Sequence, residues 1–217
     1  MTAPLPTTGP GSAAPLPAVP EAEVWAWLAG LFTAAPSPEA IAAMRRGPLA
    51  DALAALALDP DLGPGIARLR AATATGEDPA TVAVRLAVTF GRLFLGIGGP
   101  ETVPPYESAH TGSGRLFQAP VGEMERLMAA HDLAVAADLH EPADHLGIEL
   151  ALMARLVAAD HPDRAELAAR LAAWVPRFSR LCVAHDPTGY FGGAAEVLAA
   201  LVACEAERPI AAFDETK

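Results

Sequence analysis

The sequence predicts an all-α fold, a helical bundle of about nine or ten helices in two subdomains joined by a mid-chain hinge. Hydrophobic residues make up 52% of the 217 residues but aromatic residues only 6%, because much of the apolar content is alanine. Alanine has the highest helix propensity and lets helices approach closely. The alternation of β-branched and polar residues that is typical of strands is missing from the sequence.

The first 20 residues are rich in Pro, Ala, Gly, Ser and Thr, and we expect residues 1–20 to form a disordered tail. The tail has neither the basic start nor the apolar stretch of a secretory signal. No uninterrupted apolar run approaches the roughly 20 residues that span a bilayer. Cys182 and Cys204 lack CxxC spacing and lie in apolar segments, so we expect both to pack as small hydrophobic side chains in a reducing cytosol.

An N-terminal helical subdomain is expected over residues 21–117. Its first helix begins near Glu21, since the apolar residues at i, i+4, i+7 and i+8 share one face: Val24, Leu28, Leu31 and Phe32. Prolines and glycines then separate three short helices, at residues 38–46, 49–58 and 66–74. Asp78 and Pro79 are typical of the N-cap and first position of a longer helix, which ends at Gly96.

The middle of the chain is less regular. We expect an irregular segment at residues 97–118, and a loop of this length is usually functional or disordered. Residues 118–143 form the expected hinge connection, with a helix at 120–130. A C-terminal helical subdomain over residues 144–210 is expected to contain helices at 144–159, from 163 to a kink or end at Pro176, at 178–185 and at 190–207.

The formal net charge is −11. Such a surface repels nucleic acid and anionic lipid, so we expect no nucleic-acid partner and no stable membrane insertion. It attracts basic peptides, although salt screens the attraction beyond roughly 8 Å. An alternative interpretation is that the charge serves only solubility.

The first candidate site is the segment from Glu141 to Glu149. Pro142 fits a first helical turn, and Asp144 is favourable near a helix N-terminus. If the helix extends back, Glu141, His145 and Glu149 share one face. Two interpretations remain open: an N-cap with a solvated ion cluster, or an acidic and imidazole pocket whose carboxylates accept hydrogen bonds from guanidinium groups.

The second candidate site is the segment Pro104-Pro105-Tyr106-Glu107-Ser108. Its two prolines fix an extended backbone that loses little entropy when it binds. It is either an ordered loop that packs over the core or one wall of a peptide groove.

Enzymatic alternatives receive little support from the motifs. A metal site with His140 and His145 matches no HExxH pattern. A hydrolase that uses Ser108, His110 and Asp144 lacks a GxSxG elbow. The glycines after residue 95 lack the frame of a nucleotide-binding loop.

Four motifs in order resemble the TorD/DmsD family of molybdoenzyme chaperones, or redox enzyme maturation proteins. They are the sequences of residues 90–96 (FGRLFLG), 104–108 (PPYES), 141–146 (EPADHL) and 186–191 (DPTGYF). The resemblance covers about residues 21–207 and is closest to the TorD branch.

This resemblance implies an all-α cytoplasmic chaperone without catalytic activity and without a resident cofactor, although weak GTP binding is a trait of TorD-type members. The implied partners are the twin-arginine signal peptide and apo-form of a molybdoenzyme of the trimethylamine N-oxide or dimethyl sulfoxide reductase type. The chaperone assists molybdenum-cofactor insertion before export. The family's signal-peptide hinge motif, apolar groove and second loop motif fall here on Glu141, Pro142, Asp144 and His145, on Leu93 and Phe94, and on Pro105, Tyr106 and Ser108.

Two alternatives stay open. The chain could serve a nitrate reductase or dehydrogenase subunit without binding a signal peptide, or it could be a helical metal-dependent hydrolase with His110, His140, Asp144 and His145 at its site. A mid-chain hinge also permits either a monomer or a domain-swapped dimer.

Overall fold

The computed structural model describes residues 19–97, 99–111, 119–135 and 141–208. These residues contain ten α-helices, one 3-10 turn and no strand, which confirms the all-α prediction. The elements are α1 (Glu21–Thr33), α2 (Pro38–Arg45), α3 (Pro48–Leu56), α4 (Gly63–Thr73), α5 (Pro79–Phe94), η1 (Gly99–Glu101), α6 (Glu107–His110), α7 (Ala119–Ala130), α8 (Leu146–Ala158), α9 (Arg164–His185) and α10 (Tyr190–Ala206).

Local signals set most of the helix boundaries. The Ser37 side chain accepts a hydrogen bond from the backbone N–H of Ala40 at the start of α2, and Asp78 accepts one from Ala80 at the start of α5. Gly96 follows α5 with φ +77, a conformation that favours glycine. The predicted start of α2, and the predicted cap and end of α5, are therefore confirmed.

Two boundaries differ from the prediction. Helix α8 begins at Leu146 and its N-cap is His145, so Asp144 lies outside the helix. Helix α9 continues through Pro176 to His185, so of the two predicted outcomes, a kink or an end at the proline, the end is wrong. A proline inside a helix costs about 3 kcal/mol. Trp174, Val175 and Phe178 around it are fully buried, and their burial offsets that cost.

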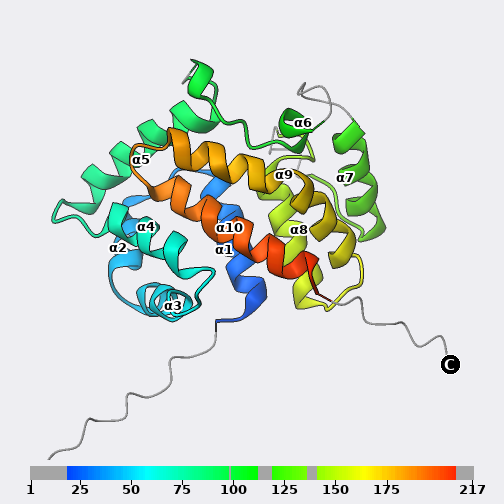
Figure 1. The fold of residues 1–217 in the computed structure, drawn as a ribbon, viewed down its shortest axis with the longest axis horizontal. Coiled ribbons are helices and arrows are strands. Elements are labelled where there is room, and N and C mark those ends of the chain that lie inside the picture. Colours follow the sequence, from blue (N-terminus) through cyan, green and yellow to red (C-terminus); the bar gives the residue numbers. More distant parts are fainter. Residues whose placement is uncertain (1–18, 98, 112–118, 136–140, 209–217) are drawn as a thin grey trace, which may run out of the picture.

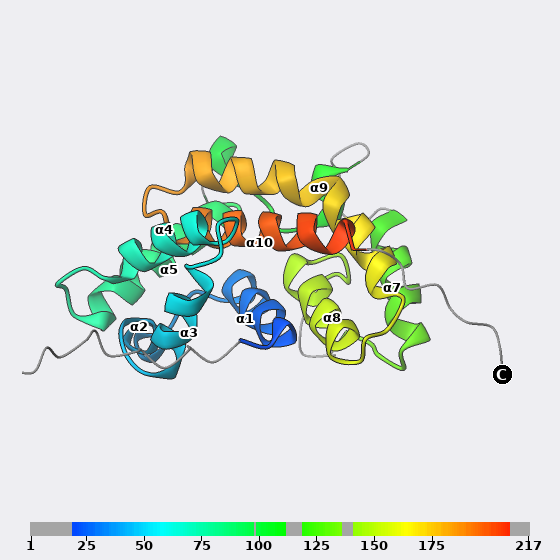
Figure 2. The ribbon, with the colours of Figure 1, turned by 60° about the horizontal axis from the view of Figure 1, so that its bottom comes forward.

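Helices α9 and α10 form an antiparallel hairpin that runs across the molecule (Figure 1). Helix α4 packs against α10, and α1 packs against α8. Seen from the side, the α9–α10 pair lies above α1 and α8 (Figure 2). Helices from both expected subdomains thus share one hydrophobic core, while the division into subdomains with a hinge at 118–143 stays a prediction.

The centre of the core is aromatic. Phe94 packs edge-on against Phe32, Phe90 and Phe191 and stacks on Phe178. Leu93 and Phe94, which we expected to line an apolar groove, are 2% and 3% exposed and belong to this core instead. Cys182 is buried as expected, but Cys204 is exposed. Among the described residues, no helix combines the length and apolarity needed to cross a membrane.

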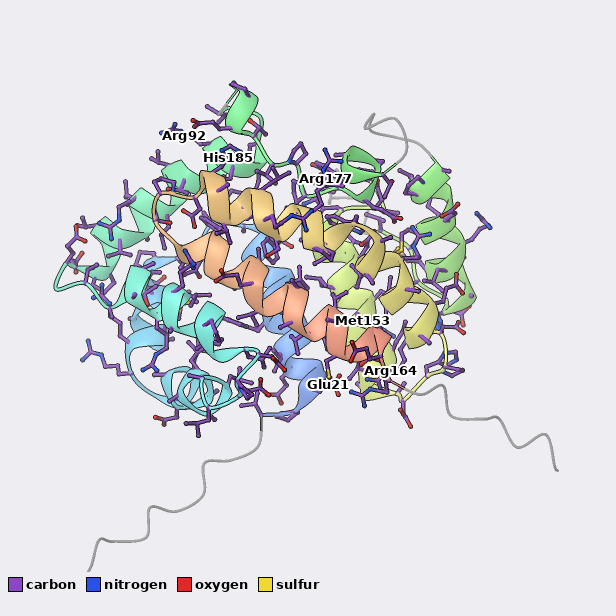
Figure 3. The ribbon with its side chains drawn as sticks, in the orientation of Figure 1. Glu21, Arg92, Met153, Arg164, Arg177 and His185 are labelled. Atoms are coloured by element: carbon purple, nitrogen blue, oxygen red, sulfur yellow. The ribbon has the colours of Figure 1, made fainter. Side chains whose placement is uncertain are left out.

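An ionic cluster forms around Arg164, at the beginning of α9. Arg164 donates two hydrogen bonds to the buried Glu205, at 2.6 and 2.8 Å, and a third to Glu21 at 3.2 Å. Figure 3 shows Arg164 and Glu21 at the same end of the molecule. The cluster joins the beginning of α9 and the end of α10 to the beginning of α1.

Replacing Gly193 with alanine should destabilise the fold. A Cβ at Gly193 would lie 2.6 Å from the Gly65 carbonyl oxygen, where α4 crosses α10. The overpacking should cost about 1–3 kcal/mol, which outweighs a helix-propensity gain of about 1 kcal/mol. The control is Gly122→Ala in α7, whose Cβ would meet nothing within 4 Å and should leave stability unchanged or higher. Urea unfolding measures both, and equal stabilities of the two variants would contradict the close crossing.

Candidate functional site

The two candidate segments of the sequence meet in space. Tyr106 and His145 form an isolated antiparallel bridge. The backbone N–H of Leu146 donates to the Pro105 carbonyl at 2.8 Å, and that of Glu107 donates to the Asp144 carbonyl at 3.0 Å. The fold therefore brings both motifs into one unit that connects α6 to the beginning of α8.

Asp144 is fully buried within this unit. Its Oδ2 accepts a hydrogen bond from the backbone N–H of Ser108 at 3.0 Å. Asp144 thus caps the first turn of α6, a helix 36 residues away in sequence, and not its own helix. The expectation of an N-cap of α8 with a solvated ion cluster is wrong, because the capped N–H groups come from the neighbouring segment.

His145 supplies the cap of α8. Its Nδ1 accepts a hydrogen bond from the backbone N–H of Gly147 at 3.0 Å. Burial lowers the pKa of His145, although the charges of Glu141 and Asp144 oppose that effect. The ring is therefore neutral near pH 7, and with Nδ1 as acceptor its proton lies on Nε2.

Glu141 is oriented by Tyr106. The Tyr106 hydroxyl donates to Glu141 Oε2 at 2.7 Å, and burial together with this carboxylate raises the pKa of Tyr106 far above its usual range. The Tyr106 ring packs edge-on against His145 with centroids 5.1 Å apart. Glu141 and Pro142 remain partly exposed. Glu141 and His145 are thus neighbours, although α8 does not extend back to place them on one helical face with Glu149.

A buried charge cluster lies beneath this unit. Glu149 is fully buried, and its pKa is raised well above the usual range by burial and then by the negative charge of Glu107. Both Glu149 oxygens lack a hydrogen-bond partner among the described residues, and the neighbouring Glu107 pairs with the Arg170 guanidinium. Arg170 also donates to Glu123 at 2.6 Å. The ion pairs of Arg170 join α9 to α6 and α7, and no local pattern in the sequence pairs Arg170 with these residues.

An apolar groove opens beside Glu141 and His145. Its volume is about 400 Å³, within the range of ligand pockets. Its other lining residues come from α1, the end of α7 and the segment after it, and α8: Ala29, Gly30, Thr33, Met128, Leu133, Ala134, Val135, Gly147, Ile148, Ala151, Leu152 and Arg155. The groove can hold several apolar side chains next to one carboxylate.

Sequence reasoning named only two of the groove residues, Glu141 and His145. The small residues in the segment that forms α1 could have indicated the groove. A Cβ at Gly30 would meet nothing within 4 Å, so no packing contact requires a glycine there. Pro105, Ser108, Leu93 and Phe94 are buried and do not line the groove, and Tyr106 is linked to it through its hydrogen bond to Glu141.

A hydrolase site does not form among the residues suggested by the sequence. His110 Nε2 donates to the Pro104 carbonyl at 2.7 Å, and its ring stacks on Trp174. Asp144 is bonded to the Ser108 backbone and not to a histidine. A catalytic triad requires the histidine between the serine and the carboxylate. His140 lies outside the described residues.

Comparison with known proteins identifies relatives over most of the chain. The family described as "Nitrate reductase delta subunit" matches residues 55–180. The chaperone protein TorD of Aeromonas salmonicida is 34% identical over 199 residues, which cover 85% of this chain and 89% of the relative. TorD of Ferrimonas balearica is 36% identical over 160 residues, 70% of this chain and 73% of the relative. TorD of Vibrio cholerae is 29% identical over 194 residues, 83% and 88% of the two chains.

A solved structure from Archaeoglobus fulgidus, assigned as a redox enzyme maturation protein, covers 82% of this chain and 91% of its own. The TM-score is 0.51 and the identity 16%. At this identity the likeness concerns the fold alone.

Replacing Glu149 with glutamine should stabilise the protein at neutral pH but not in acid. The carboxyl titrates near pH 4.3 when unfolded and well above that when folded. Rising pH therefore deprotonates the unfolded state first and lowers the stability of the wild type. Glutamine has nearly the same shape as glutamate and carries no charge at neutral pH, so it avoids this penalty. Urea unfolding at pH 4 and pH 7.5 should show a gain only at the higher pH. The exposed Glu166→Gln on α9 is the control, and a loss of stability in Glu149→Gln at pH 7.5 would exclude a protonated Glu149.

Proposed function

This chain belongs to the TorD/DmsD family of chaperones, described as the nitrate reductase delta subunit family, and on that premise we propose that it is a cytoplasmic chaperone of a molybdoenzyme. The resemblance seen in the sequence is confirmed by these relatives, and so is the prediction of a chaperone in place of an enzyme. We propose that the chain binds the apo-form of a reductase of the trimethylamine N-oxide or dimethyl sulfoxide type and assists insertion of its molybdenum cofactor before export.

The observation that supports a peptide site is the shared lining of the groove. Glu141 and His145 lie on the same groove as the apolar residues of α1 and α8. A twin-arginine signal peptide has guanidinium groups followed by an apolar run, and the groove offers a matching carboxylate and apolar wall. The net charge of −11 favours the approach of such a basic peptide.

The candidate residues take two different parts in this proposal. Glu141, Pro142 and His145 are the ones at or near the groove surface. Asp144, Ser108 and Pro105 fix the backbone that carries them, and Tyr106 orients Glu141. Leu93 and Phe94 support the core. We therefore expect substitutions of Glu141 to act through binding. Substitutions in the second set should act through stability, and so in part should those of His145, which is buried and caps α8.

A second candidate is the maturation of a nitrate reductase subunit without signal-peptide binding. The family description of the match at residues 55–180 favours this alternative. Co-purification of the native partner from the source organism identifies the client. A competition experiment then distinguishes the two candidates, because only the first predicts that an isolated signal peptide competes with the partner.

Replacing Glu141 with glutamine should weaken binding of a synthetic peptide that carries Arg-Arg followed by an apolar run. Loss of one charge-assisted hydrogen bond costs about 1–2 kcal/mol, or about 5–30-fold in affinity. Calorimetric titration measures it. The matched control is Glu125→Gln on the exposed face of α7, which changes net charge equally. Equal affinities for the two variants would remove Glu141 from the peptide site.

Replacing Gly30 with leucine should block the groove without unfolding the protein. The position is exposed, has free space around it and lies in α1, so leucine should preserve or raise stability while it fills the groove. We expect at least about a tenfold loss of affinity for the same peptide. Gly122→Leu in α7 is the control. Unchanged peptide affinity in Gly30→Leu would place the peptide elsewhere on the molecule.

A further inference from the structure

Two histidines and an aspartate meet where α7 and α8 end and α9 begins. His131 follows α7, His161 lies between α8 and α9, and Asp163 directly precedes α9. Nε2 of His131 lies 3.0 Å from Oδ2 of Asp163, and Nδ1 of His161 lies 3.8 Å from Oδ1 of the same carboxylate. The ligating atoms of all three side chains lie within 4.8 Å of one another.

The backbone holds the two imidazoles in this position. Helices α7 and α8 each end at a turn with a left-handed aspartate, Asp132 at φ 55 and Asp160 at φ 47, the non-glycine residues with positive φ in the described part of the chain. Hydrogen bonds from the N–H of Leu133 to Met128 and of His161 to Leu156 close these turns. The two histidine rings consequently pack edge to face with centroids 4.6 Å apart.

We propose that His131, His161 and Asp163 bind a zinc ion. Two imidazoles and one carboxylate form a ligand set that zinc accepts, with water in the fourth position. Ligands of a tetrahedral zinc lie about 3.3 Å apart, whereas the atoms here lie within 4.8 Å of one another, so binding requires the half-exposed His161 to rotate toward the other two. Nδ1 of His161 accepts a weak hydrogen bond from the Asp163 backbone N–H at 3.3 Å, which a zinc ion would replace.

The charge environment favours a cation at this point. The carboxylate of Asp163 contacts both histidines, and no lysine or arginine forms an ion pair with it among the described residues. A zinc ion would take the place of the hydrogen between His131 and Asp163. Because protons compete for both imidazoles, binding should weaken as the pH falls.

The site lies next to the groove in sequence. Leu133, Ala134 and Val135 line the groove and follow His131 directly after the turn. Zinc would tie the beginning of this wall to the beginning of α9, a helix that the core holds firmly. We therefore expect the ion to stabilise the region around the end of α7.

The test is calorimetric titration of the untagged, chelator-treated full chain with zinc chloride, together with thermal unfolding. The wild type should bind one equivalent at pH 7.5, unfold at a higher temperature with zinc, and lose binding by about pH 5.5. His161→Gln and Asp163→Asn, both at partly exposed positions, should each weaken binding at least about tenfold. The control His185→Gln lies at the other end of α9 (Figure 3) and should bind as the wild type does.

The following results would overturn the zinc proposal. If the wild type takes up no zinc, or if the two site variants bind as tightly as His185→Gln, the three side chains form only a hydrogen-bonded cluster. Cobalt substitution gives an independent spectroscopic signature of tetrahedral coordination, and its absence from a cobalt-loaded wild type would have the same meaning. These outcomes do not depend on peptide binding, so the chaperone proposal stands or falls separately.

Discussion

The site depends on one buried carboxylate. Asp144 accepts the Ser108 backbone N–H and, through its own carbonyl, that of Glu107, so it joins the loop before α6 to the turn before α8. A buried carboxylate without hydrogen bonds would cost several kcal/mol, and this requirement leaves little freedom in how the two segments pair. The pairing in turn places Tyr106 under Glu141 and His145 at the beginning of α8.

The buried charges beneath the site affect the stability of the fold more than the charges on the surface do. Glu107, Glu149 and Arg170 are mostly buried, and removing one partner of such a group typically costs 3–5 kcal/mol. The exposed pair Arg68 and Glu196 is worth roughly 0–1 kcal/mol. Arg170 pairs with Glu107 and Glu123, and the raised pKa of Glu149 favours an uncharged carboxyl beside that group.

The groove itself owes its shape to small residues. Gly147 contacts Thr33 so closely that a Cβ would collide with its hydroxyl, and α1 therefore lies directly against α8. Gly30 and Ala151 leave space above this contact. The result is an apolar groove with a carboxylate from the segment before α8, Glu141, and a cation from α8 itself, Arg155. A peptide with one basic and one apolar end fits that asymmetry better than a small polar substrate does.

The sequence by itself determined the fold class, the cap of α5, the end of α5 at Gly96 and the family. These are local or patterned properties, since a capping side chain reaches only the first turn of its own helix and an apolar stripe repeats along one element. Tertiary structure alone decided that Asp144 caps α6, that Phe94 is core and that α9 runs through Pro176. It also decided that His131 meets His161 and Asp163. Each of these depends on contacts between segments far apart in the chain, and no local pattern encodes which distant group will satisfy a buried charge or fill the space beside a ring.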